Sequence, residues 1–180
     1  MNRKIFLLGL IGLGIFLISL PKTRGYIVEA YEKLKSLIAG EEGLSLKAYK
    51  DQVGKWTIGY GHLIRPGEPY HPYGPIKEIT QDQAEKLFMQ DIASAERCVK
   101  NNVKRSLTNS QYAALVSFVF NVGCTAFTNS TLLKKLNAND PSAAQEFDKW
   151  VYGTNPNGEK IKLAVLVNRR LRERDLFMTA

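Results

Sequence analysis

The sequence predicts an α+β, mostly helical protein, in which an N-terminal hydrophobic segment precedes a small antiparallel β-hairpin lobe and a larger helical lobe. Three observations lead to this prediction. Residues 5–20 form an uncharged apolar run, residues 44–64 contain short runs of Tyr, Trp, Thr and Ile separated by glycines, and helix-start signals recur from Thr80 onward. A chain of 180 residues has room for one domain with a hydrophobic core and a short appendage. We therefore expect residues 1–24 to be a signal-anchor or transmembrane segment and residues 25–180 to be one folded domain.

The apolar run IFLLGLIGLGIFLISL at residues 5–20 follows Arg3 and Lys4. At about 1.5 Å per residue, a helix of this length is near the minimum that spans a hydrocarbon core of roughly 30 Å. Three interpretations stay open: a cleaved secretory signal, a permanent anchor with its basic end in the cytoplasm, and a weak anchor that later leaves the bilayer. The lack of a small-x-small cleavage site after the run favours the two uncleaved forms. In all three, residues 25–180 lie outside the cytoplasm.

The charge and the cysteines fit such a location. The chain has 25 Lys and Arg against 17 Asp and Glu, a formal net charge of +8, which favours an anionic partner such as nucleic acid, a membrane surface or bacterial cell wall. No recognised nucleic-acid-binding module is present, so we expect no nucleic-acid partner. Cys98 and Cys124 suit one disulfide in an oxidising compartment, and two buried thiols are the alternative.

The first elements of the folded part follow from local patterns. Apolar side chains at helical spacing predict an amphipathic helix over residues 26–39. Residues 44–64 then predict a small antiparallel sheet, because strand-forming runs are interrupted at Asp51 and Gly54. Prolines recur through residues 65–76, which predicts an extended loop with polyproline character, serving either as the rim of a binding cleft or as a rigid connector.

Capping signals mark the helical lobe. A capping box begins at Thr80 and a second begins at Thr108. Residues 112–122 are apolar on nearly every side, so this helix is predicted to be the buried centre of the lobe. Gly123 stands where a helix C-cap is expected.

The remainder of the chain predicts two more helices. Asp140 and Pro141 form an N-cap and first turn. The last helix begins near Lys162 and carries four arginines, which we expect to form a mostly solvated face with one or two ion pairs. A β lobe beside a helical lobe commonly leaves a cleft between them.

Glu42, Asp51 and Thr57 are separated by nine and then six positions. Glycoside hydrolysis needs two such carboxyl groups, one to protonate the leaving oxygen and one to act on water or on the sugar cation. Glu42 is the candidate general acid, provided that partial burial raises its pKa. Asp51 would stay ionised, and the Thr57 hydroxyl would hold the attacking water. Taken singly, these residues could be a helix-end carboxylate, a turn former and a strand residue. Their joint spacing favours the catalytic interpretation.

These motifs resemble those of the phage lysozymes, glycoside hydrolase family 24. The resemblance covers residues 25–180 and is carried by Glu42-Gly43, Asp51, the run TIGYGHL from Thr57, FVFNVG at 118–123, FTNS at 127–130, Trp150 and Asn168-Arg169-Arg170. It implies a lysozyme-like two-lobed fold and hydrolysis of the β-1,4 bond between N-acetylmuramic acid and N-acetylglucosamine in peptidoglycan. It also implies inversion at the anomeric carbon, with Glu42 as general acid and with Asp51 and Thr57 positioning and activating water. No cofactor or metal is implied.

The resemblance carries further expectations. Leu63, Phe120 and Ser130 are expected to contact the glycan, and Arg169 is expected to pair with Glu42.

His62 and His71 with Glu68 make a poor metal set, so His62 is expected to be a structural hydrogen-bonding residue behind the hairpin.

The N-terminal segment resembles that of signal-arrest-release endolysins. This implies a bacteriolytic endolysin for host lysis, tethered through residues 5–20 to the host inner membrane, facing the periplasm, and periplasmic after release. We expect it to be a monomer. Its partner would be the glycan strands of peptidoglycan. The alternatives are a lytic transglycosylase, which uses the acid alone and forms a 1,6-anhydro product, and a non-catalytic membrane-tethered protein that binds the cell wall.

Overall fold

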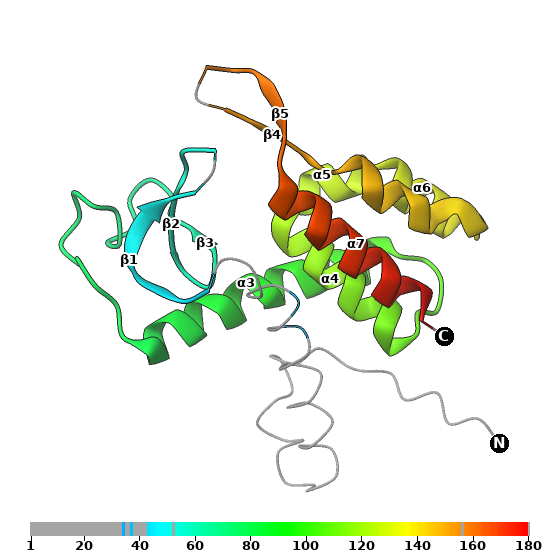
Figure 1. Cartoon of the computed structure of the whole chain (residues 1–180). Coiled ribbons are helices and arrows are strands. Elements are labelled where there is room, and N and C mark those ends of the chain that lie inside the picture. The colour runs from blue at the N-terminus through cyan, green and yellow to red at the C-terminus, as the bar shows by residue number, and fades with distance from the viewer. Residues whose placement is uncertain (1–33, 35–36, 38–42, 52, 156, 180) are drawn as a thin grey trace, which may run out of the picture.

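The computed structural model describes residues 34, 37, 43–51, 53–155 and 157–179. Within these residues the chain forms two small antiparallel sheets and a set of helices (Figure 1). The elements in chain order are β1 (Ser45–Lys50), β2 (Trp56–Gly59), β3 (His62–Leu63), α3 (Gln81–Asn102), α4 (Asn109–Val122), α5 (Cys124–Thr128), α6 (Thr131–Asn137), η1 (Pro141–Lys149), β4 (Tyr152–Thr154), β5 (Lys160–Lys162) and α7 (Ala164–Met178). The mostly helical α+β architecture predicted from the sequence is confirmed.

Several predictions fall outside the described residues. They concern the apolar segment 5–20, the boundary between residues 24 and 25, most of the helix expected at 26–39, and Glu42. Among the helices of the described part, none is both long and apolar enough to cross a bilayer.

The β lobe is the antiparallel sheet β1-β2-β3, as the strand-forming runs at 44–64 predict. The β1–β2 turn closes where the Asp51 N–H donates to the Lys55 carbonyl at 2.9 Å. Gly59 and Gly61, around the second turn, have φ values of 66° and 87°, which glycine adopts without a steric penalty. These turns place Asp51 at the end of β1, on the side of the sheet that faces the helical lobe.

The proline-rich loop at residues 65–76 is not the extended segment that the sequence predicts. It folds into successive turns, closed where the Glu68 N–H donates to the Arg65 carbonyl at 3.1 Å and the Ile76 N–H donates to the Pro69 carbonyl at 3.1 Å. An extended polyproline helix has no internal hydrogen bonds. The loop therefore adopts turns instead of polyproline conformation, because the turns give its backbone N–H and C=O groups hydrogen-bond partners within the loop.

Helix α3 joins the two lobes (Figure 1). It packs against β2 and β3 in the β lobe and against α4 and α5 in the helical lobe. Its start is the predicted capping box: the Thr80 hydroxyl accepts from the Gln83 N–H at 3.2 Å, and the Gln83 side chain accepts from the Thr80 N–H at 2.8 Å. The same arrangement begins α4 at Thr108. Both predicted capping boxes are confirmed.

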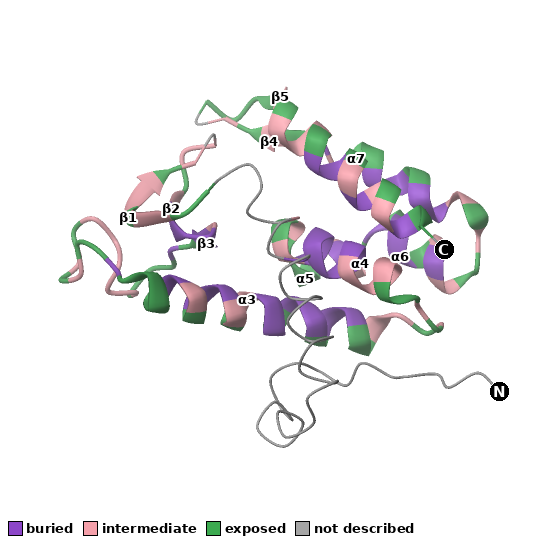
Figure 2. Ribbon diagram, turned by 60° about the horizontal axis from the view of Figure 1, so that its bottom comes forward, coloured by how far each residue is buried: buried purple, intermediate pink, exposed green. Residues whose placement is uncertain are grey.

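Helix α4 is the centre of the helical lobe, as predicted. Its residues from Ala114 to Val119 are all buried, and the helix ends at Gly123 with φ 85°. The fully buried ring of Phe118 meets three other rings edge-on, those of Phe127, Phe147 and Trp150. Figure 2 shows the buried sides of α3, α4 and α7 turned toward one another, which is where the core of this lobe lies.

The segment after Asp140 differs in helix type. The Asp140 side chain caps it by accepting from the Ser142 N–H, as predicted, but η1 is a 3₁₀ helix. Its buried residues include the pairs Ala143 with Glu146 and Ala144 with Phe147. Members of each pair are three positions apart, which is the period of a 3₁₀ helix, so each pair lies on one side of it.

A hairpin that the sequence analysis missed precedes the last helix. Strands β4 and β5 pair antiparallel, and the turn between them is held by the Asn155 side chain, which accepts from the N–H groups of Asn157 and Glu159 at 3.0 and 2.9 Å. The Asn-Gly pair at 157–158 is a common hairpin signal. The flanking strands are only three residues long, which is too short for a strand pattern to stand out in the sequence.

Helix α7 also departs from expectation. Arg169 and Arg170 are buried rather than solvated, and Glu173 beside them is fully buried. Tertiary packing against α4 covers this side of the helix, and charge composition alone gave no sign of it.

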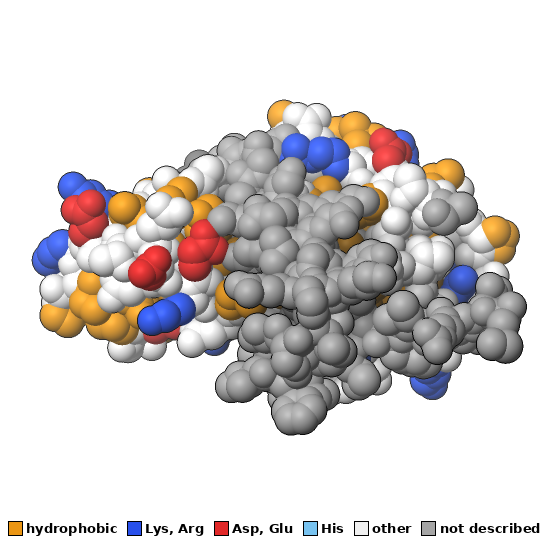
Figure 3. Space-filling model, turned by 90° about the horizontal axis from the view of Figure 1, so that it is seen from below, with side chains coloured by type: hydrophobic (Ala, Val, Ile, Leu, Met, Phe, Trp, Pro, Cys, Tyr) orange, Lys and Arg blue, Asp and Glu red, His pale blue; other side chains and the backbone are white. Residues whose placement is uncertain are grey.

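Positive and negative side chains are interspersed on the face of the described surface that Figure 3 shows. On the face seen in Figure 3, Lys and Arg side chains lie among Asp and Glu side chains over the β lobe rather than in one basic patch. The net charge of +8 is therefore not concentrated on this part of the described surface.

Candidate active site

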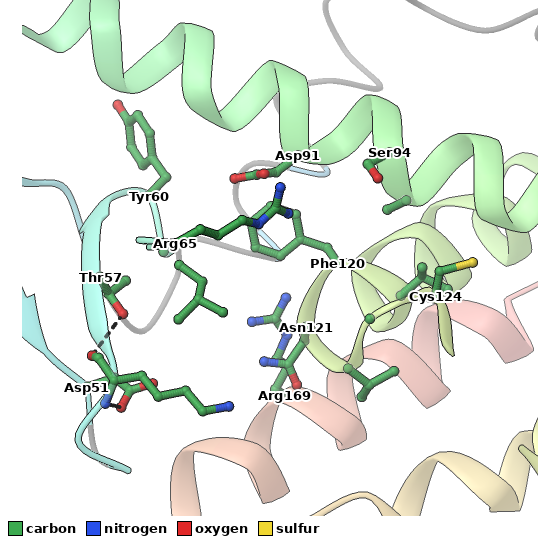
Figure 4. Close-up of a pocket in the computed structure, with 17 residues that line it drawn as sticks. Asp51, Thr57, Tyr60, Arg65, Asp91, Ser94, Phe120, Asn121, Cys124 and Arg169 are labelled. Carbon is green, nitrogen blue, oxygen red and sulfur yellow. Dashed lines mark hydrogen bonds between the residues drawn. The ribbon is translucent and has the colours of Figure 1, made fainter. Parts of the chain in front are cut away.

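A cavity of about 510 Å³ lies between the β lobe and the helices (Figure 4). The β lobe contributes Asp51, Thr57 and Leu63 to its lining, and the helical lobe contributes Phe120 and Arg169. Asp51, Thr57, Leu63 and Phe120 were all predicted to act on or contact the substrate, and they line one cavity together with Arg169 although they come from distant parts of the sequence. Ser130, which was also predicted to contact the substrate, does not line this cavity.

A second cavity of about 500 Å³ adjoins the first. The two share Asp51, Lys55, Asn121 and Val122 in their linings, so Asp51 lies at their junction. The second cavity extends toward the β4–β5 hairpin and includes Trp150. A polymer that runs along both cavities would pass the Asp51 carboxylate.

The two oxygens of Asp51 have different roles. Its Oδ1 accepts backbone hydrogen bonds from the Val53 N–H at 2.9 Å and the Lys55 N–H at 2.8 Å, which holds the β1–β2 turn. Its Oδ2 accepts no hydrogen bond from any other residue that the structure describes, and the side chain is half-buried at the cavity wall. The turn-forming and the catalytic interpretations of Asp51 are thus compatible, because each uses a different oxygen.

Thr57 lies in β2 with only 4% of its surface exposed. Its hydroxyl donates to the Lys55 carbonyl at 3.3 Å, the contact drawn as a dashed line in Figure 4. Because the proton is used within the turn, the lone pairs of Oγ1 are the part of the hydroxyl that remains for a molecule in the cavity.

Leu63 and Phe120 supply apolar surface on opposite sides of the cavity. Leu63, at the end of β3, is 46% exposed. The Phe120 ring packs edge-on against Phe88 at 5.8 Å and lies 5.8 Å below the guanidinium of Arg169.

Arg169 lines the cavity, but its described partners lie within the helical lobe. Its Nε donates to Glu173 at 3.2 Å and its Nη2 donates to the Ser117 carbonyl at 3.2 Å. The partner predicted for it, Glu42, lies outside the described residues.

Ser130 is placed away from both cavities. It is the N-cap of α6, where its hydroxyl donates to the Phe127 carbonyl at 2.6 Å and accepts from the Leu133 N–H at 3.1 Å. The hydroxyl is therefore engaged in the fold, and a role toward the glycan stays a prediction.

Cys98 and Cys124 are joined by a disulfide in the structure. It ties α3 to the start of α5, and Cys124 borders the first cavity. The bridge fixes the α4–α5 corner from which Phe120 reaches the cavity.

His62 is a structural hydrogen-bonding residue, as predicted. Its Nδ1 lies 2.7 Å from Asp91 Oδ2 and its Nε2 lies 3.1 Å from Glu68 Oε2. Burial alone lowers the pKa of His62, but the hydrogen bonds and charges of Asp91 and Glu68 outweigh it and raise that pKa above the ordinary 6.5. The cluster links β3, α3 and the proline-rich loop. In the described part of the chain, this cluster included, no group of three or more His, Cys, Asp or Glu side chains is arranged to hold a metal.

Asn121 and Asp91 are among the cavity residues for which the sequence predicted no role. Asn121 lies within the FVFNVG motif, beside Phe120, and Asp91 lies on α3. Helical periodicity could have placed Asp91 on the face toward the sheet. The FVFNVG motif marks the segment that contains Asn121, but it predicts no particular role for that residue.

Comparisons with known proteins find relatives that are similar in sequence and in fold. Residues 39–173 match the protein family described as Phage lysozyme. The endolysin of Acyrthosiphon pisum secondary endosymbiont phage 1 is 45% identical over 150 residues, covering 83% of this chain and 97% of that protein. The SAR-endolysin of bacteriophage PS119 is 35% identical over 143 residues, covering 77% of each chain. Among solved structures, the muramidase domain of SpmX from Asticaccaulis excentricus superposes with a TM-score of 0.68 at 35% identity, covering 82% of this chain and 96% of that one.

The two-lobed fold, the cavity between the lobes and these similarities lead to one conclusion. The chain belongs to the phage lysozyme family and is a glycoside hydrolase.

Proposed function

We propose that this protein is an endolysin that hydrolyses the β-1,4 bond between N-acetylmuramic acid and N-acetylglucosamine in peptidoglycan. Membership of the lysozyme family supports peptidoglycan as the substrate, and the relatives named endolysin support a role in host lysis. The observation that carries the proposal is that Asp51 and Thr57 line the same cavity between the lobes. That cavity adjoins a second one, which gives an extended substrate room on both sides of Asp51.

The proposed mechanism is an inverting hydrolysis. Glu42 protonates the leaving glycosidic oxygen, and a water molecule attacks the anomeric carbon from the opposite side. Asp51 Oδ2, which accepts no hydrogen bond from the described residues, accepts one hydrogen bond from that water, and a lone pair of Thr57 Oγ1 accepts the other. With both protons directed to acceptors, a water lone pair is left for the attack, and Asp51 takes up the proton that is released.

The N-terminal part of the proposal concerns location. Residues 1–24 would act as a signal-anchor that holds the domain at residues 25–180 on the periplasmic side of the host inner membrane until release. The resemblance to a SAR-endolysin supports this. The enzyme is proposed to act as a monomer, since both walls of the cavity come from one chain.

The test uses the full chain, purified in mild detergent and incubated with purified sacculi. Mass spectrometry of the released muropeptides would identify the bond that is cut. We expect reducing-end disaccharide products whose formation is nearly abolished in Glu42→Gln, because a positioned acid contributes about 10²–10⁴-fold. NMR of the first products would show the α-anomer if the reaction inverts. Anhydro products would instead indicate a lytic transglycosylase, and products that persist in Glu42→Gln would contradict the assignment of the acid.

A further inference from the structure

A buried polar network lies behind the helical wall of the cavity. Glu173, fully buried on α7, receives three hydrogen bonds at its Oε1: from the Ser117 hydroxyl at 2.6 Å, from Arg169 Nε at 3.2 Å and from Arg170 Nη2 at 3.3 Å. Arg170 is also fully buried, and its Nε lies 2.9 Å from Glu173 Oε2. Burial lowers the pKa of Arg170 to about 10, so its guanidinium stays charged at neutral pH.

One donor of this network reaches the cavity wall. Arg170 Nη2 donates to Asn121 Oδ1 at 2.9 Å. Asn121 is exposed at the end of α4 and lines both cavities, where they meet at Asp51. In Figure 4, Asn121 and Arg169 lie across the cavity from Asp51 and Thr57.

The contact determines which way the Asn121 carboxamide points. A guanidinium has only donors, so the atom that faces Arg170 must be the carboxamide oxygen. A flipped carboxamide would set its NH₂ group against the guanidinium donors and leave a buried donor unpaired. The Nδ2 group is therefore directed away from Arg170, and no described residue accepts a hydrogen bond from it.

We propose that Asn121 is a substrate-binding residue, whose carboxamide, oriented by the buried Arg170, donates an N–H to the acetamido carbonyl of a sugar beside the scissile bond. The inference rests on the proposed function, because it needs a glycan that carries acetamido groups in these cavities. An acetamido carbonyl is the strongest neutral acceptor that such a sugar offers. Arg170 is a positioning residue: it fixes the donor before the substrate arrives, so little orientational freedom is lost on binding.

Asn121→Asp tests the donor directly. The variant keeps an oxygen for Arg170, and so keeps the network, but presents a carboxylate oxygen to the cavity in place of the N–H. With soluble uncrosslinked glycan strands of peptidoglycan as substrate, we expect KM to rise on the order of 10-fold or more, with a smaller change in kcat. The melting temperature should stay the same or rise. The matched control is Asn109→Asp, in the first turn of the same helix, which has the same charge change on an exposed residue outside both cavities.

Arg170 is tested through a double-mutant cycle. Arg170→Lys keeps a buried cation near Glu173 but loses the planar fork that reaches two acceptors. If Arg170 acts through Asn121, the variant raises KM in the parent chain and has little further effect on KM in an Asn121→Ala background. An equal rise in KM in both backgrounds would show that Arg170 has only a structural role. That result would overturn the proposal that Arg170 positions Asn121.

The outcomes separate this inference from the proposed function. Absence of glycan hydrolysis by the unaltered chain would defeat the proposed function. Hydrolysis with a KM in Asn121→Asp within about two-fold of the parent, which corresponds to less than half a kcal/mol, would overturn the inference alone. The Asn121→Asp result decides the donor role even if Arg170→Lys fails to fold.

Discussion

Asp51 is the residue at which local structure and proposed chemistry meet. One carboxylate oxygen caps the β1–β2 turn, and the other remains available at the junction of the two cavities. The turn therefore positions the carboxylate through one oxygen and leaves the other directed to the cavity. Asp51 can serve both the turn and the proposed reaction, because its carboxylate has two oxygens.

Replacing Asp51 with Asn separates these roles. The Asn side chain oxygen can still accept from the backbone N–H groups of Val53 and Lys55, so we expect a melting temperature close to that of the parent. The loss of the charge should lower the rate of glycan hydrolysis about 10²–10⁴-fold. Asp51→Ala should lose both the activity and some stability. Activity in Asp51→Asn close to that of the parent would mean that Asp51 serves only the turn.

His62 gives a second residue-scale expectation. Its raised pKa means that the charged form is stabilised by folding, so the contribution of the cluster is complete below the unfolded pKa of about 6.5. The contribution is lost as the pH rises through the raised pKa of the folded state. Asp91→Asn should thus lower the melting temperature on the order of 5 °C at pH 6, with a difference that shrinks as the pH rises through the raised pKa of folded His62. Thermal unfolding followed by circular dichroism at several pH values measures this.

The control for His62 is an acid that faces no histidine. Asp175 is exposed on α7 and contacts Arg174 at 3.3 Å. Asp175→Asn should change the melting temperature little and equally across the same pH range. A pH-independent deficit in Asp91→Asn would instead mean that Asp91 acts through packing or a neutral hydrogen bond.

At the scale of elements, α7 carries the clearest departure from the sequence prediction. Two adjacent arginines point into the protein, and one buried carboxylate, Glu173, compensates both. A buried ion pair of this kind adds little net stability compared with apolar packing, but it is costly to break because the remaining charges stay buried. The network is better understood as fixing the orientation of side chains at the cavity wall.

Glu173→Gln tests the cost of breaking this network. The change leaves Arg170 buried beside a neutral side chain, so we expect the free energy of unfolding to fall by about 3–5 kcal/mol. Glu159→Gln is the control, since Glu159 is exposed on the β4–β5 hairpin and its carboxylate contacts Asn155. It should change stability by less than about 0.5 kcal/mol. Urea unfolding of the two variants and the parent would decide, and similar midpoints for all three would contradict this account.

At the scale of the whole molecule, the cavity depends on two lobes that share one helix. Helix α3 packs against β2 and β3 in one lobe and against α4 and α5 in the other. The disulfide between Cys98 and Cys124 ties the far end of α3 to the corner after α4. The wall that holds Phe120 and Asn121 is thus anchored to the same helix as the β lobe that holds Asp51.

Removing the disulfide should therefore affect stability more than catalysis. Closing a loop of 26 residues restricts the unfolded chain by roughly 3–4 kcal/mol. We expect Cys98→Ala with Cys124→Ala, or the parent under reducing conditions, to unfold at correspondingly lower urea. Glycan hydrolysis well below the unfolding midpoint should be retained. Equal midpoints with and without reductant would contradict a stabilising role.

The sequence by itself determined what depends on neighbours along the chain. The capping boxes at Thr80 and Thr108, the helix end at Gly123 and the strands around Asp51 each rest on interactions within a few positions, so residue type and spacing suffice to predict them. The spacing of Asp51 and Thr57 belongs to the same class, because a single turn sets their separation. The prediction that both face one cavity followed from their family pattern.

Only the tertiary structure decided which side chains meet from distant parts of the chain. Asn121 and Arg170 are 49 positions apart, and Ser117 and Glu173 are 56 apart. No local periodicity encodes such contacts, since they exist only after α7 packs on α4. For that reason the arginines of α7 resembled a solvated face in the sequence. The folded chain instead buries two of them and uses one to orient a side chain at the cavity wall.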